Sequence, residues 1–153
     1  MFSAPIGDLS NYSVTVLTQP TTPNQTCQVD LGSGLINGDD VDNVFVTCSI
    51  NNYFLGGTIS GLFRGNKLLL NNNDTEVRLL FNNGTYFFNT PLPDESDYNV
   101  TIYQQPDLPI LPCDIANGNS TMTGDDVTDI DVTCEFGDDL IYRHGFENEP
   151  ANL

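Results

Sequence analysis

The sequence predicts an all-β protein: an Ig-like antiparallel β-sandwich, present as one complete module preceded by the C-terminal half of another. Three observations lead to this prediction, namely short runs of alternating apolar and polar residues, turn residues between the runs, and an internal repeat. The chain of 153 residues has room for one domain of ordinary size or two small ones. Its nine Phe and six Tyr are enough to bury a core.

Each strand is predicted from a run with one apolar face, because successive side chains of a strand point to opposite sides. Such runs occur at residues 12–17, 44–48, 58–62, 67–70, 77–81, 86–89, 98–103 and 130–134. Turn residues separate them, as at Gly56-Gly57, Gly65-Asn66 and residues 71–74. The dipeptide Asn83-Gly84 lies between two apolar runs and predicts a β-hairpin there. No segment has a convincing helical period.

An internal repeat aligns residues 12–50 with residues 98–136 at a constant offset of 86, and about 15 of about 39 aligned pairs are identical. We call these two stretches the N-terminal copy and the C-terminal copy. The period is close to the length of one small sandwich domain. We therefore expect a half module in residues 1–52, a complete module in residues 53–136 and a C-terminal tail in residues 137–153.

A half module leaves an apolar face without an opposing sheet. In the N-terminal copy this face consists of Tyr12, Val14, Val16, Val44 and Val46. Three arrangements would cover it: the repeat array extends beyond this sequence, the half module packs on the complete one, or a neighbouring chain donates strands. A candidate for such donation is the segment of residues 2–9. The sequence leaves all three arrangements open.

The four cysteines form two pairs with identical spacing, Cys27 with Cys48 and Cys113 with Cys134. Because each pair lies within one copy, bridging inside a copy is the simplest of the three possible connectivities. A metal site is a weaker interpretation, since there is no Cys-x-x-Cys and only one His. Structural disulfides persist in an oxidising compartment, so the sequence predicts an extracellular or cell-surface location.

Aspartates cluster in both copies and are candidate calcium ligands, because calcium binds carboxylate and carbonyl oxygens in loops of this composition. They are Asp39, Asp40, Asp42, Asp125, Asp126, Asp129 and Asp131. Their spacing does not fit an EF-hand. The alternative is a solvated acidic edge that deters strand pairing. Apart from possible calcium, we expect no cofactor.

The net charge of -17 limits the classes of partner. A phosphate backbone and an anionic membrane surface would both be repelled. No run of about 20 apolar residues is present, so we expect no membrane insertion. The expected partner is protein, either through self-association or through neighbouring modules.

No catalytic site is predicted, and we expect a protein that is not an enzyme. The only histidine, His144, lies in the polar tail, and no Gly-x-Ser-x-Gly accompanies it. Paired-carboxylate chemistry needs only two acids at the right distance. Because the chain has 21 acidic residues, that condition does not single out a catalytic pair.

The order of motifs resembles a tandem module of secreted and cell-surface bacterial proteins, which string together Ig-like or carboxypeptidase-regulatory-like sandwiches. The resemblance lies in residues 56–62, 68–72, 83–88 and 98–106, followed by the segment from Cys113 to Cys134. It implies an extracellular β-sandwich with a disulfide and no enzymatic site. Residues 138–147 of the tail are similar to a short gammaproteobacterial C-terminal motif, Ile-Phe-x-x-Gly-Phe-Glu.

Three functions are consistent with these patterns. The leading hypothesis is a non-enzymatic structural or adhesive repeat of a bacterial surface protein. The second is a subunit of an extracellular filament that is completed by strand donation between chains. The third is a carbohydrate-binding sandwich, for which Phe45, Phe87 and Tyr103 are candidate exposed aromatics.

Overall fold

The structure is a computed structural model that describes residues 4–107 and 111–135. These residues form strands and turns and no helix, so the protein is all-β as predicted. No helix long and apolar enough to cross a membrane occurs in this part of the chain. The whole predicted tail (residues 137–153), including His144 and the C-terminal motif, lies outside the described residues, so its role stays a prediction.

The described residues divide into two compact units. Unit 1 contains the chain up to Tyr53 together with Leu92–Ser96 and Met122–Asp125. Unit 2 contains Phe54–Pro91, Asp97–Thr121 and the described residues that follow Asp125.

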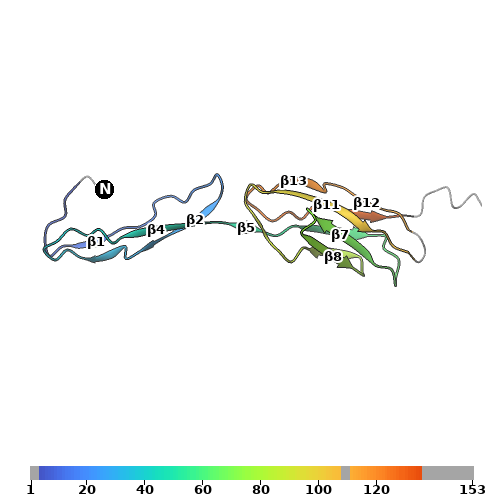
Figure 1. Ribbon diagram of the computed structural model, residues 1–153, viewed down its shortest axis with the longest axis horizontal. Coiled ribbons are helices and arrows are strands. Elements are labelled where there is room, and N and C mark those ends of the chain that lie inside the picture. Colours follow the sequence, from blue (N-terminus) through green and yellow to red (C-terminus); the bar gives the residue numbers. More distant parts are fainter. Residues whose placement is uncertain (1–3, 108–110, 136–153) are drawn as a thin grey trace, which may run out of the picture. The chain divides into compact units, whose positions relative to one another are not determined.

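Unit 2 is a sandwich of two four-stranded sheets. The first sheet holds, in spatial order, β13 (Asn119–Thr121), β11 (Asp97–Gln104), β7 (Leu68–Asn72) and β8 (Glu76–Leu80); Figure 1 labels all four. The second holds β12 (Cys113–Ile115), β14 (Val132–Cys134), β6 (Gly56–Ser60) and β9 (Gly84–Phe87). Alternate residues of both sheets are buried, as expected for strands with one inward face. They include Leu68, Leu70, Val100, Ile59, Tyr86 and Val132.

The core of unit 2 is tight where β6 passes the segment before β14. A Cβ atom at Gly57 would lie 1.9 Å from the carbonyl oxygen of Ile130, so only glycine allows this approach. Beside it, the buried Tyr86 hydroxyl donates to the same oxygen at 2.9 Å. Burial and the nearby Asp131 carboxylate raise the pKa of Tyr86 far above its ordinary value, so the phenol keeps its proton.

One strand pair of unit 2 is parallel. Residues Val132 and Thr133 of β14 align with Ile59 and Ser60 of β6 and run in the same direction. The prediction of a wholly antiparallel sandwich is therefore wrong for this pair. Parallel strands need a long connection, and the chain provides one because the rest of the module lies between β6 and β14.

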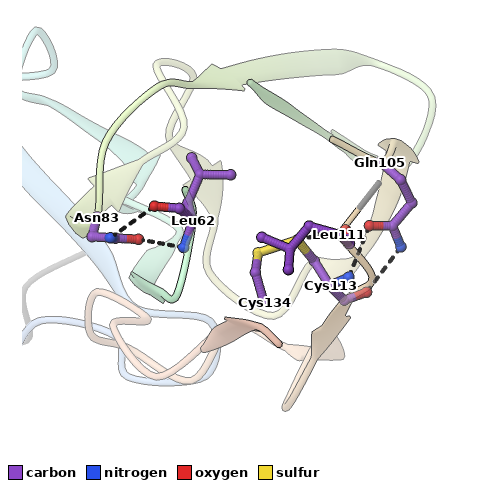
Figure 2. Close-up of a disulfide and its surroundings, with 6 residues drawn as sticks. All are labelled: Leu62, Asn83, Gln105, Leu111, Cys113 and Cys134. Carbon is purple, nitrogen blue, oxygen red and sulfur yellow. Dashed lines mark hydrogen bonds between the residues drawn. A yellow bond between two sulfur atoms is a disulfide. The ribbon is translucent and has the colours of Figure 1, made fainter. Parts of the chain in front are cut away.

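The predicted hairpin at Asn83-Gly84 is also wrong. Strand β8 pairs with β7 in one sheet and β9 pairs with β6 in the other, so this connection crosses between sheets. The Asn83 side chain accepts from the amide of Leu62 at 2.8 Å and donates to its carbonyl at 3.1 Å (Figure 2). The hairpin in this region instead joins β7 to β8 through Asn73 and Asp74, both with positive φ.

Unit 1 contains three two-stranded antiparallel sheets. β1 (Asn11–Ser13) pairs with β3 (Ser33–Leu35), and β5 (Asn52–Tyr53) pairs with β10 (Leu92–Pro93). β2 (Gln25–Asp30) and β4 (Phe45–Ile50) pair over their whole length and run side by side in Figure 1. The strand predicted at residues 12–17 is shorter than expected, because β1 ends at Ser13.

The two copies share strand register and positive-φ positions 86 residues apart. Pairing of Tyr12 with Gly34 in β1–β3 corresponds to pairing of Tyr98 with Ser120 in β11–β13. Pairing of the cysteines in β2–β4 corresponds to that in β12–β14. Positive φ values of similar size recur at three pairs of positions: Leu9 and Glu95, Leu31 and Asn117, and Gly38 and Gly124.

Candidate functional site: the open face of the N-terminal copy

The N-terminal copy lacks two strand partners that the C-terminal copy has. In unit 2, β11 pairs with β7 and β14 pairs with β6. Their counterparts β1 and β4 each have one partner among the described residues, β3 and β2. Each of these two-stranded sheets therefore corresponds to one half of a four-stranded sheet: β1–β3 lacks the counterparts of β7 and β8, and β2–β4 lacks those of β6 and β9.

Side-chain exposure shows the consequence for the face itself. Val46 is 59% exposed, whereas its counterpart Val132 is 1% exposed. Val14 and Val44 are half-buried, whereas their counterparts are part of the core of unit 2. The apolar face predicted from the sequence is present, and no sheet formed by the described residues of unit 1 covers it.

This face holds a groove with a volume of about 530 Å³. Its walls are mainly apolar and include Ile6, Tyr12, Val14, Ile36 and Val44. Tyr12 lies over Gly34, where a Cβ atom would come within 2.7 Å of the Tyr12 hydroxyl oxygen. The Tyr12 hydroxyl donates to the carbonyl of Leu31 at 3.3 Å, which fixes the ring at the rim.

The candidate calcium ligands are divided between the two units. Asp39, Asp40 and Asp42 line the groove in unit 1. In unit 2, Asp126 accepts the amide of Phe54 at 2.7 Å and Asp131 accepts the hydroxyl of Thr58 at 2.5 Å. Across residues 4–107 and 111–135, no three acidic, His or Cys side chains gather closely enough to hold a metal ion. Calcium binding stays a prediction, with no site assigned to Asp125 or Asp129.

The structure contains both disulfides with the predicted pairing, Cys27 with Cys48 and Cys113 with Cys134. Each bridge is supported by a glutamine that the sequence analysis overlooked. Gln105 accepts from the amide of Cys113 and donates to its carbonyl, both at 2.9 Å (Figure 2). Gln19 makes the same pair of bonds to Cys27, at 2.7 and 3.1 Å. The signal was a Gln-Pro dipeptide eight residues before the first cysteine of each copy.

An aspartate before each copy was overlooked as well. The carboxylate of Asp8 accepts the amide of Gly38 at 2.7 Å. Its counterpart Asp94 is buried and accepts the amide of Asn24 at 2.6 Å, while its other oxygen has no partner among the described residues. The repeat could have been extended to these positions, because residues 5, 8 and 10 are identical to residues 91, 94 and 96.

The aromatics considered for carbohydrate binding do not lie on one sheet. Tyr103 is on β11, Phe87 is on β9 in the other sheet, and Phe45 belongs to unit 1. Phe87 does line a second groove of about 530 Å³, together with Phe54 and Arg78.

The carboxylate of Glu76 binds backbone amides next to this second groove. Glu76 accepts the amides of Asn89 and Thr90 at 2.7 and 3.0 Å, and Asn89 accepts a bond from Arg78 at 3.1 Å. Partial burial raises the pKa of Glu76, but these hydrogen bonds and the positive charge of Arg78 outweigh burial and lower it below its ordinary value.

Comparison with known proteins adds no relative. The chain matches no family model, no curated protein and no solved structure. A functional proposal for this chain has to account for two features of the molecule itself: the half module that recurs after 86 residues, and the open face of its first copy.

Proposed function

We propose that this protein is a non-enzymatic building unit of a bacterial surface protein, in which Ig-like sandwiches follow one another as tandem modules outside the cell. The observation that carries the proposal is the recurrence of a half module with the same strand register, the same positive-φ positions and the same disulfide. Repeating one supersecondary unit along a chain is how structural arrays are built. The bridges support an oxidising location.

The strand arrangement of unit 2 suits a chain under tension. β6 is the first strand of the unit and β14 is its last described strand, and they lie side by side and parallel. Tension that enters at the start of β6 and leaves at the end of β14 pulls these strands past each other, so the bonds between them are stretched together rather than opened one by one. Thr58 and Asp131 add a side-chain link across this pair.

Pulling single molecules by their two ends tests the proposal. We expect the oxidised chain to resist until unit 2 opens in one step, and reduction to release further length at each bridge. A bridge encloses a sequence separation of 21, which corresponds to about 70 Å of extended chain.

A matched pair of variants makes the test specific for the parallel pair. Thr58→Val removes the hydroxyl hydrogen bond to Asp131, keeps the one from the Thr58 amide, and should lower the opening force because it weakens the β6–β14 contact. Thr85→Val makes the same change on β9, on the other side of β6, and should leave the force unchanged. Opening at negligible force, or equal effects of the two variants, would contradict a structural role under tension.

A carbohydrate-binding function is the second candidate, and the groove of Phe54, Phe87 and Arg78 favours it. Exposed aromatic rings can stack on the apolar faces of sugar rings, and a guanidinium can bond to hydroxyls or carboxylates. Binding of a polysaccharide panel that is lost in Phe87→Ala and kept in Phe45→Ala would favour this function over the structural one.

A further inference from the structure

We infer that the open face of the N-terminal copy is an acceptor for a polypeptide segment with the strand pattern and charge of this chain's own residues 54–91, which we call the β6–β9 segment. This inference rests on the proposed modular function and names the partner of the open face. The partner is an additional segment of this type, since the one in this chain is already paired in unit 2.

The C-terminal copy is the template for this contact. There, the β6–β9 segment supplies β6 to the edge of β14 and β7 to the edge of β11, and it covers Val100, Ile130 and Val132. The N-terminal copy has the same register in β2–β4 and leaves the corresponding edge of β4 free. The counterparts of the residues that pair with β7 are residues 14–18, which follow β1 and pair with no described strand. A second β6–β9 segment could therefore add β6 to the edge of β4 and extend β1 by pairing β7 with residues 14–18.

The backbone before β4 is also prepared for such a strand. In unit 2, Val127 donates to the carbonyl of Phe54 at 2.9 Å and accepts from the amide of Gly56 at 2.8 Å. The counterpart of Val127 is Val41, which lines the groove. No backbone partner of Val41 occurs within the described residues. These free groups point to an extended strand as the occupant rather than a compact apolar ligand.

Net charge also favours a β6–β9 segment as the occupant of the open face. The β6–β9 segment holds three of the four Lys and Arg residues of the chain, Arg64, Lys67 and Arg78, against two acids, for a formal net charge of +1. Residues 1–53 hold five acids and no Lys or Arg, for a net charge of -5. Residues 92–135, which pair with the segment in unit 2, hold ten acids and no Lys or Arg. Attraction between opposite charges favours this segment over a second acidic half module, which would be repelled.

The test adds a synthetic peptide of residues 54–91, labelled with a fluorophore, to the full chain at low ionic strength. We expect saturable binding with one peptide per chain, weakened by added salt. Val46→Asp places a charge on the open face and should weaken binding by at least about tenfold. Leu17→Asp is the matched control, because Leu17 is 97% exposed in the same unit and its counterpart Tyr103 is exposed too. Equal binding by the two variants would overturn the inference.

Two further measurements test the inference even if the free peptide fails to bind. First, residues 54–86 are placed directly before Met1, which reproduces the spacing before Phe87. Amide exchange at Val14, Val44 and Val46 should then slow by at least about tenfold towards that of their counterparts. Unchanged exchange would refute the acceptor role. Second, a dimer of the unmodified chain that Val46→Asp converts to a monomer would show that a second copy covers the face, which also refutes it. None of these outcomes depends on the pulling experiment, which reports on unit 2.

Discussion

Val46 and Val132 occupy the same position in the two copies and differ in burial. The same mutation at both sites therefore measures how much stability a residue gains when this face is covered. Val→Ala removes two methylene-sized groups. At about 0.8 kcal/mol for each buried group, the transfer cost is about 1.6 kcal/mol, and the cavity raises it to about 2–3 kcal/mol at Val132, which is 1% exposed. At Val46, which is 59% exposed, we expect less than about 0.7 kcal/mol.

Urea unfolding followed by NMR separates the two effects, because amide signals of Val29 and Ile59 report on units 1 and 2 respectively. Val132→Ala should lower the midpoint seen at Ile59 and leave that seen at Val29 nearly unchanged. Val46→Ala should change neither midpoint much. If Val46→Ala costs as much in unit 1 as Val132→Ala costs in unit 2, the face is covered in solution and the reasoning about an open acceptor fails.

Three further predictions concern ionisation and redox chemistry. A reductant should open Cys27–Cys48 before Cys113–Cys134, because Cys48 is exposed and both cysteines of the second bridge are buried. Alkylation followed by peptide mass spectrometry measures the reduction rate of each bridge, and equal rates would contradict this prediction. Because the pKa of Tyr86 is raised on folding, its contribution to stability is full below the unfolded pKa of about 10 and is lost at higher pH. Tyr86→Phe should abolish the last step of a spectrophotometric tyrosine titration, and an unchanged titration would contradict this. Because the pKa of Glu76 is lowered on folding, its contribution to stability is present above the unfolded pKa of about 4.3 and is lost as the pH falls. Glu76→Gln should therefore lower the free energy of unfolding by less than about 1 kcal/mol at pH 7 and leave it unchanged in acid. Thermal unfolding at both pH values measures the difference.

Each of the eight predicted runs overlaps a strand, because alternation of side chains is a local property of the backbone. The other strands, β2, β3, β5, β10, β12 and β13, were not predicted. Strand lengths could not be predicted either. Residues 12–16 and 98–102 have nearly the same sequence, yet β1 ends at Ser13 whereas β11 continues to Gln104. The difference is the partner: β7 pairs with the second half of β11, and no strand among the described residues of unit 1 pairs with the corresponding residues 14–18. A ladder needs two strands, so its length depends on residues far away in the sequence.

The same reason explains the two errors in topology. An Asn-Gly dipeptide favours a tight turn, but whether the flanking strands then share a sheet depends on their other neighbours. At Asn83 the side chain bonds to Leu62, and this contact with a distant residue decides the direction of the chain. For the candidate site, the apolar face was predictable from the repeat, whereas the supporting roles of Gln19 and Asp8 follow only from their hydrogen bonds in the folded chain.

The pairing of β6 with β14 also has a consequence for the order in which the protein is made. Thr58 and its partner Asp131 are 73 residues apart, so at about 5–20 residues per second β14 leaves the ribosome about 4–15 s after β6. During this interval the newly made β6–β9 segment has no acidic half module of its own to close upon. In a longer array, each such segment would pass through a period in which the half module made before it is the nearest finished surface. Correct folding of tandem copies therefore depends on how fast translation supplies the second half, and slow translation at residues 92–131 should increase mispaired products.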